Sequence, residues 1–166
     1  MTATINASTS SGVVITPDNS GNILLQYNGQ SAPAFSAYAS TGTSVTANTW
    51  AKITLDSESF DTNSNFASSR FTPTVAGYYQ ISAGFGVTST SVQNIWIAIY
   101  KNGVTWQTGI LFTSASGVGG VTNMSTLVYC NGSTDYIELY GLSSVTQTLN
   151  TGSTLTYMNG CLLRGA

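Results

Sequence analysis

The stretch that decides the fold covers residues 68–87 and reads SSRFTPTVAGYYQISAGFGV. From Tyr79 to Val87 every second residue is apolar, and the residues between them are Gln, Ser or Gly. This alternation is typical of a β-strand with one face buried, because successive side chains of a strand point to opposite sides. A turn containing Pro73 and Gly77 precedes it. The stretch therefore predicts a sheet that covers a hydrophobic core.

The composition extends this prediction to the whole chain. The 166 residues are 42% hydrophobic and only 6% charged, with no His. Disorder requires low hydrophobicity and high charge, so we expect one folded domain with a sizeable core. Ser, Thr, Val, Ile and aromatic residues outnumber strong helix formers, which favours strands. We predict an all-β protein.

The charged residues exclude several classes of partner. The formal net charge is −2, and the cations are Lys52, Arg70, Lys101 and Arg164. Four scattered cations cannot neutralise a phosphate backbone or bind an acidic membrane surface, so we expect no nucleic-acid partner and no membrane insertion. The first twelve residues, MTATINASTSSG, lack the basic and apolar regions of a secretory signal. We expect a protein made in the cytoplasm of a host cell.

Turn residues divide the chain into short strands. Residues 1–31 are predicted to be a β-rich attachment segment, with a turn at Asn28-Gly29, and residues 32–166 one domain. Asn102-Gly103 and Asn131-Gly132 each lie between apolar runs and predict hairpins. The spacing suits a sandwich or jelly roll. The expected strands are 33–39, 49–55, 66–73, 77–88, 94–101, 104–113, 119–130, 134–142 and 154–163.

Some strands are apolar on both faces. Within residues 94–101, three isoleucines alternate with Trp96, Ala98 and Tyr100. A strand facing water on one side would carry polar residues there, so a second buried surface is expected. Subunit interfaces are rich in Tyr and Trp and poor in charge, which favours an oligomer. The alternative is a single large core with some exposed tyrosines.

Five motifs in order carry a resemblance to a known family: PAFSA (33–37), RFTPTVAGYY (70–79), KNG (101–103), DYIEL (135–139) and YMNGCLL (157–163). Together they resemble the globular head domain of complement C1q, in the tumour necrosis factor superfamily. The resemblance covers about four fifths of the chain and implies a ten-strand jelly roll that forms a tight homotrimer. The chain departs from the animal proteins in having no collagen stalk and in carrying Tyr157 where the last aromatic is usually Phe.

The N-terminal residues carry a second, shorter resemblance. The stretch SGVVITPDNSGNILLQYNG (11–29) is similar to segments of bacteriophage structural and fibre proteins. It implies a virion protein, so we expect the protein on the surface of a phage particle. A capsid decoration or cement protein is preferred to a tail-fibre tip, because fibres usually carry a longer attachment region and a stalk.

The sequence offers little for catalysis or for metal binding. An activated Ser or Cys nucleophile needs a base, most often His, and none is present. We therefore expect no enzyme, no cofactor and no metal site. Asp56, Glu58 and Asp61 lie close together, but we expect a solvated loop there; calcium at a trimer apex stays open. Cys130 and Cys161 are expected to be buried free thiols; a disulfide between them is the alternative, and their spacing does not decide between the two.

These observations combine into a trimeric surface knob that decorates or cements a phage capsid. The expected partners are two further copies and other virion proteins. The alternative is a tail-fibre tip or receptor-binding module that recognises a host surface glycan or protein. Packing is favoured over sugar stacking for the tryptophans, although Trp106 follows a hairpin and is expected to be exposed. The residues predicted to face the trimer axis are Trp96, Tyr100, Tyr136, Glu138, Tyr140 and Tyr157.

Overall fold

The computed structural model describes residues 26–27, 30–88, 91–109, 111–117 and 119–166. These residues form β-strands and connecting turns, without a helix, and they include no helical segment long and apolar enough to cross a membrane. Most of the predicted attachment segment, including the phage-like stretch up to residue 25, lies outside the described residues. Two short strands in it, β1 (Gln26–Tyr27) and β2 (Gln30–Ser31), pair antiparallel on either side of the predicted Asn-Gly turn.

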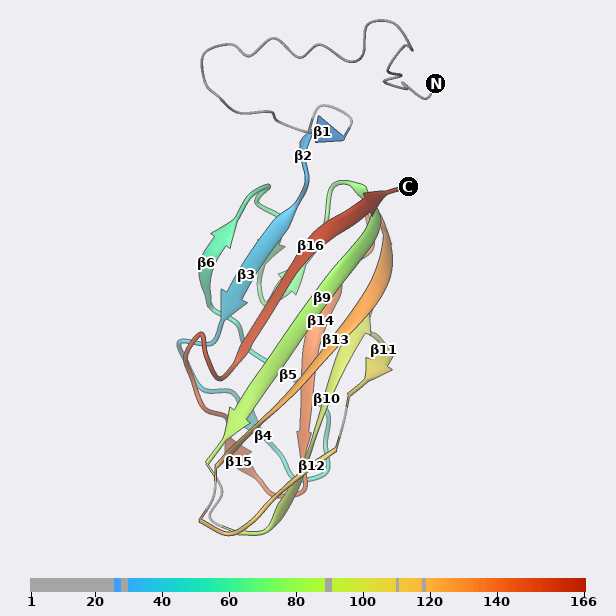
Figure 1. Ribbon diagram of the computed structural model, residues 1–166. Helices are drawn as coiled ribbons and strands as arrows, with labels where there is room; N and C mark the ends of the chain where they lie inside the picture. The colour runs from blue at the N-terminus through green and yellow to red at the C-terminus, as the bar shows by residue number, and fades with distance from the viewer. Residues whose placement is uncertain (1–25, 28–29, 89–90, 110, 118) are drawn as a thin grey trace, which may run out of the picture.

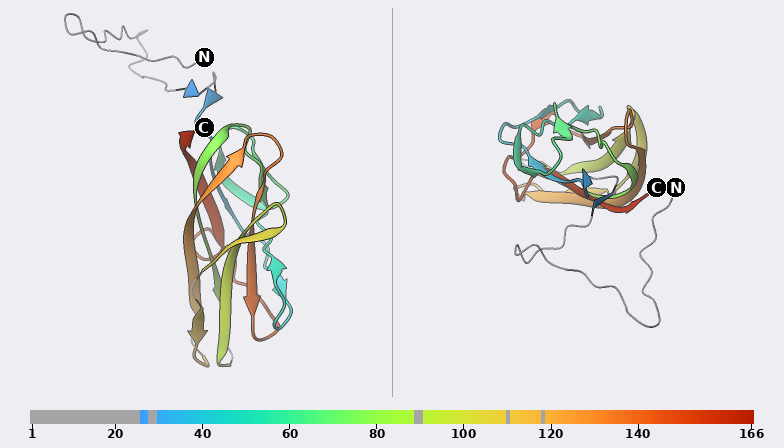
Figure 2. Two further views of the ribbon diagram at one scale, coloured as in Figure 1. Left: turned by 90° about the vertical axis from the view of Figure 1, so that its right-hand side faces the viewer. Right: turned by 90° about the horizontal axis from the view of Figure 1, so that it is seen from above.

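Two antiparallel sheets form the body of the molecule and lie face to face (Figures 1 and 2). In the five-stranded sheet the order is β13 (Gly120–Asn131), β9 (Ala76–Val87), β16 (Tyr157–Gly165), β3 (Ala34–Tyr38) and β6 (Ser57–Asp61). In the seven-stranded sheet the main path is β11 (Val104–Thr108), β10 (Gln93–Lys101), β14 (Ile137–Ser143), β8 (Arg70–Phe71) and β7 (Phe66–Ala67). The other two strands of that sheet are β12 (Phe112–Ser114), paired with β10, and β5 (Ala51–Lys52), paired with β14. A separate pair, β4 (Ser44–Val45) and β15 (Gln147–Thr148), lies at one end.

The hydrophobic core fills the space between the two sheets. The apolar positions predicted on the 79–87 alternation are all buried, and they face the three buried isoleucines of β10. Phe35 and Phe71, one from each sheet, stack with ring centroids 4.2 Å apart. This arrangement confirms the predicted all-β sandwich, because each sheet contributes one apolar face.

Most predicted strands are present, with several corrections. The predicted strand 66–73 is the pair β7 and β8, the predicted strand 104–113 is divided into β11 and β12, and β4 and β15 lie outside the predicted strands. Residues 57–61, predicted to be part of a solvated loop, form the edge strand β6. None of its side chains is fully buried, so the apolar alternation that identifies other strands is missing there. Backbone pairing with β3 through Phe60, Glu58 and their neighbours holds this strand in the sheet instead.

The predicted Asn102-Gly103 hairpin joins β10 to β11, but the hairpin predicted at Asn131-Gly132 is wrong, because that turn leads from β13 to β14, which lie in different sheets. One carboxylate joins the two turns. Asn102 and Gly103 have φ of 54° and 76°, as a tight turn with left-handed residues requires. Asp135 Oδ1 accepts a hydrogen bond from Asn102 Nδ2 (2.7 Å), and Oδ2 accepts one from the Asn131 N–H (3.0 Å). Lys101 Nζ lies 2.9 Å from Oδ2. The buried Asp135 therefore links the two turns.

The outer edge of β13 is covered by side chains from the opposite sheet. Trp106 Nε1 donates a hydrogen bond to the Leu127 carbonyl (3.1 Å), and Lys101 Nζ donates one to the Tyr129 carbonyl (2.8 Å). β13 is the last strand of its sheet among the described residues, so these carbonyls have no strand beside them. The two side chains satisfy backbone acceptors that an edge strand otherwise exposes.

Candidate functional site

Five of the six residues predicted for the trimer interface lie on the outer face of the seven-stranded sheet. They are Trp96 and Tyr100 on β10, Tyr136 just before β14, and Glu138 and Tyr140 on β14. Tyr100 is paired with Glu138, and Tyr140 with Ala98, across the two strands. The isoleucines between them point into the core. The structure thus brings these five side chains together, as strand alternation predicts.

Three of these five side chains make ring contacts within a single chain. The rings of Tyr100 and Tyr140 stack with centroids 3.8 Å apart, and the Arg70 guanidinium lies 3.7 Å from the centroid of Tyr136. The rings of Tyr100, Tyr136 and Tyr140 are therefore already in contact with other side chains of the same subunit.

A nearly buried carboxylate lies at the centre of this surface. Glu138 is only 3% exposed, and its Oε1 atom lies 2.8 Å from Lys52 Nζ and 2.9 Å from Arg70 Nη2. Burial, and after it the charge of Glu138, raises the pKa of the Tyr140 hydroxyl. The ion pairs explain how a charged residue is kept among aromatic side chains.

Tyr157 lies on the other sheet. It belongs to β16 and is paired with Gly84 of β9 and Tyr38 of β3. Its neighbour Met158 is fully buried, so Tyr157 points outward from the five-stranded sheet. The six predicted residues therefore do not form one continuous surface.

The outer face of the five-stranded sheet carries an apolar patch that the sequence analysis did not identify. We call it the β9–β13 patch and define it as Tyr78, Leu127 and Tyr129. Tyr78 is 50% exposed and Leu127 is 54% exposed, and the rings of Tyr78 and Tyr129 lie 5.4 Å apart. The outward positions of both strands carry no charged residue. The signal available in the sequence was Tyr78 on the polar side of the 78–87 alternation.

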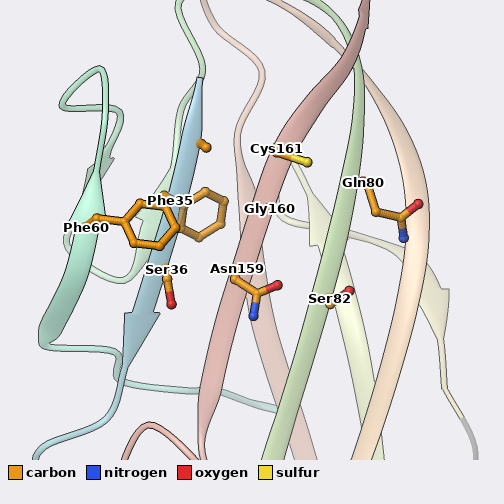
Figure 3. A pocket seen from close by; sticks show the side chains of 9 residues that line it. Phe35, Ser36, Phe60, Gln80, Ser82, Asn159, Gly160 and Cys161 are labelled. Atoms are coloured by element: carbon orange, nitrogen blue, oxygen red, sulfur yellow. The ribbon is translucent and has the colours of Figure 1, made fainter. Parts of the chain in front are cut away.

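A shallow groove lies on the same face, towards the opposite edge of the sheet (Figure 3). It has a volume of about 300 Å³, and β6, β3, β16 and β9 all contribute to it. Phe60, which is 50% exposed, forms one side, and Gln80 and Ser82 form the other. Ser82 Oγ is hydrogen-bonded to Ser125 Oγ of β13 (2.9 Å), which connects the groove to the β9–β13 patch.

The two cysteines are free and occupy opposite sides of this sheet. Cys130 is buried, and burial raises its pKa to about 12, so it is an inert thiol. Cys161 is exposed at the groove, which corrects the expectation that both thiols are buried. The alternation of β16 places Cys161 outward, because Met158 and Leu162 pack against the core.

The acidic residues around β6 serve the local backbone. Asp56 Oδ1 accepts a hydrogen bond from the Ser40 N–H (2.6 Å), and this bond is the main cause that lowers the pKa of Asp56 to about 2. Asp61 Oδ2 accepts one from the Phe66 N–H (2.7 Å). Within the part of the chain that the structure describes, no three Cys, Asp or Glu side chains gather as a metal site.

The comparisons with known proteins concern the fold. No protein-family model and no curated protein matches the sequence. Among solved structures, the globular domain of zebrafish complement 1qA protein matches 81% of this chain and 99% of its own, with a TM-score of 0.63 and 14% identity. Murine APRIL at pH 5.0 matches 80% and 99% (TM-score 0.60, 9% identity). Eiger TNF from S. frugiperda matches 81% and 93% (TM-score 0.54, 8% identity). The chain therefore has the jelly-roll fold of complement C1q and tumour necrosis factor domains.

Proposed function

We propose that this chain is the subunit of a homotrimeric, non-enzymatic knob on the surface of a bacteriophage particle, where it decorates or cements the capsid. The observation that carries the proposal is the β9–β13 patch, an apolar surface on strands whose outward positions are uncharged. Exposed apolar side chains that lie together in one patch are typical of protein–protein interaction sites. The partner proposed here is a second copy of the chain.

The composition of the face supports association between subunits. Tyr is enriched and charge is depleted at the centres of interfaces. Leu127 and Tyr78 are about half exposed in the single subunit, so a partner has apolar area left to cover. On the seven-stranded sheet, by contrast, three of the four predicted aromatic residues already make ring contacts inside the subunit. We therefore assign the subunit contact to the five-stranded sheet, where Tyr157 is the only one of the six predicted residues.

Two unlike features on one face favour a closed ring. The β9–β13 patch contains half-exposed aromatic and leucine side chains, whereas the groove beside Phe60 is recessed. A contact between two different surfaces of identical chains forms a ring if its rotation closes and an open filament if it does not. The sequence resemblance to the complement C1q head domain implies that closure occurs at three copies.

A structural rather than catalytic role fits the chemistry of the chain. It has no His, and the carboxylates of Asp135 and Glu138 are both held in ion pairs. The virion location rests on the phage-like N-terminal stretch. A three-fold knob also matches the three-fold positions of an icosahedral shell, so one attachment geometry would serve all three copies.

Sedimentation velocity tests the assembly. The wild-type chain is expected to sediment as a trimer of about 52 kDa, since one copy has a mass of 17.3 kDa. Leu127→Asp places a charge in the proposed interface and is expected to yield monomers. Val104→Asp is the matched control, because Val104 is 70% exposed on β11, away from this face. A wild-type monomer at micromolar concentration, or a trimeric Leu127→Asp variant, would refute the proposed interface.

Immunogold labelling of purified phage particles tests the location. Gold over the shell supports a decoration or cement protein. Gold confined to the tail instead supports a fibre tip or a receptor-binding module. Particles without any label, from a preparation in which the protein is expressed, contradict the virion role.

A further inference from the structure

A second cavity lies along the side of the sandwich, between the outermost strands of the two sheets. We call it the lateral cleft. It has a volume of about 450 Å³, within the range of small-molecule sites. β11 and β13, which line up on the same side in Figure 1, form its walls. Its lining residues are Gln107, Thr108, Gly109, Asn123, Met124 and Ser125.

The lining of the lateral cleft is polar but uncharged. Two amide and two hydroxyl side chains line it, together with a glycine and a thioether. Phosphate, sulfate or carboxylate groups are usually bound by Arg, Lys or several N–H donors, and the lining has no cation. An apolar ligand would leave the amides without partners. The chemistry that fits is a neutral molecule with many groups that both donate and accept hydrogen bonds.

One of the two amides is held in place by a buried neighbour. Gln107 Oε1 accepts a hydrogen bond from Thr126 Oγ1 (2.7 Å), and Thr126 is only 7% exposed. This bond fixes the orientation of the amide and occupies its oxygen, so that the Nε2 group is the end offered to a ligand. Preorganised polar groups of this kind reduce the entropic cost of binding.

An exposed indole lies next to the lateral cleft. Trp106 precedes Gln107 and is 46% exposed. Its Nε1–H group donates to the carbonyl of Leu127, two residues beyond Ser125, so the ring is anchored at the β13 wall. A half-exposed aromatic ring with a fixed polar end provides apolar area at low entropic cost. The C–H face of a pyranose ring is a matching surface.

From these features we propose that the lateral cleft binds a neutral carbohydrate, with Trp106 as the apolar contact and with Gln107 and Asn123 as the hydrogen-bonding groups. The inference does not depend on the virion location. Asn123 and Ser125 point outward from β13 as Leu127 does, so the site lies beside the proposed subunit contact. If the protein is a monomer that binds sugar, the proposed trimer is refuted and the proposed sugar site stands. If it is a trimer that binds no sugar, the sugar site is refuted and the trimer stands.

Titration of the full chain with neutral oligosaccharides tests the site. The probes are maltotetraose, cellotetraose, chitotetraose and mannotetraose, followed by tryptophan fluorescence and by calorimetry. At least one probe is expected to bind with a millimolar or lower Kd, and trigalacturonate, which is charged, is expected to bind at least tenfold more weakly. No binding of any neutral probe at millimolar concentration overturns the proposal, and so does equal binding of the charged one.

Variants locate the binding site. Trp106→Ala is expected to weaken binding at least tenfold, and Asn123→Ala about fivefold, the effect of one lost hydrogen bond. Trp106→Phe keeps an aromatic ring and is expected to restore most of the affinity. Trp96→Phe, on the outer face of the seven-stranded sheet, is the matched control and is expected to stay within twofold of wild type. Wild-type affinity in both the Trp106→Ala and the Asn123→Ala variants would place the sugar elsewhere and refute the assignment.

Discussion

Replacing Asp135 by Asn tests whether this carboxylate joins the two Asn-Gly turns. Asn keeps the shape and one oxygen, which can still accept from Asn102 Nδ2. It places an NH₂ group where Oδ2 now accepts from the Asn131 N–H at 3.0 Å and pairs with Lys101 at 2.9 Å. A hydrogen bond to a charged group contributes roughly 1.5–3 kcal/mol, and an unsatisfied buried donor adds to the loss. We expect a destabilisation of about 3 kcal/mol.

Thermal unfolding measures this loss. For a domain of this size, 1 kcal/mol shifts Tm by about 3 °C, so Asp135→Asn is expected to lower Tm by about 9 °C. All proteins must be compared at one concentration, because assembly makes Tm depend on it. Glu58→Gln, an exposed carboxylate on β6, is the control and is expected to change stability by less than about 0.5 kcal/mol.

The same pair of proteins gives a pH dependence with a definite sign. The hydrogen bond from Asn102, with those from Lys101 and the Asn131 N–H, lowers the pKa of Asp135 in the folded state, although burial opposes the shift. A lowered folded pKa means that the carboxylate stabilises the fold above its unfolded pKa of about 3.9 and ceases to do so as pH falls through the folded value. The Tm difference between wild type and Asp135→Asn should therefore be full at pH 6 and should shrink as pH falls below about 4. A difference under 1 °C at pH 6, or one that stays constant down to pH 2, would refute this reasoning.

Three further predictions follow from the site and the turns. Glu138→Gln leaves Lys52 and Arg70 without their counter-ion and is expected to lower the free energy of unfolding in urea by about 2 kcal/mol. The trimer is expected to sediment unchanged, and its dissociation would assign the subunit interface to the seven-stranded sheet. Gly132→Ala forces a side chain onto a φ of 74° and against the backbone of Val75 and Ala76 at the start of β9, and is expected to cost about 2 kcal/mol; an unchanged unfolding midpoint would contradict this. With a thiol-specific disulfide reagent at pH 8, Cys161 in the groove should react faster in the Leu127→Asp monomer than in the trimer. Cys130 should react only after unfolding. Equal reaction rates of Cys161 in the two proteins would place the groove outside the subunit interface.

Periodicity predicted which way side chains point, and it did so well where one face of a strand is apolar. The alternation from Tyr79 to Val87 identified a core face, and Asn102-Gly103 identified a hairpin, because both signals depend on residues close together in the chain. Asn131-Gly132 is a turn as well, but the strands on its two sides belong to different sheets, which a local signal does not reveal. The edge strand β6 lacks that signal. It is held by backbone pairing to β3, which leaves no mark on its side chains.

Periodicity did not predict what outward-facing side chains meet. It placed Tyr100 and Tyr140 outward, but it could not show that these rings, forty residues apart in sequence, stack on each other. The assignment of Tyr157 to the same surface failed for a related reason: the strand that carries it joins the other sheet. The β9–β13 patch was missed because Leu127 and Tyr129 become neighbours of Tyr78 only once two distant strands pair.

The covered edge of β13 has a consequence for a protein made in many copies. A bare strand edge can recruit a strand from another molecule and seed the growth of fibrils at high local concentration. Here an indole and an ammonium group occupy two carbonyls that such growth would use. Strand addition at that edge is thereby disfavoured at high protein concentration, and the outer faces of the sheets remain as the surfaces through which copies associate.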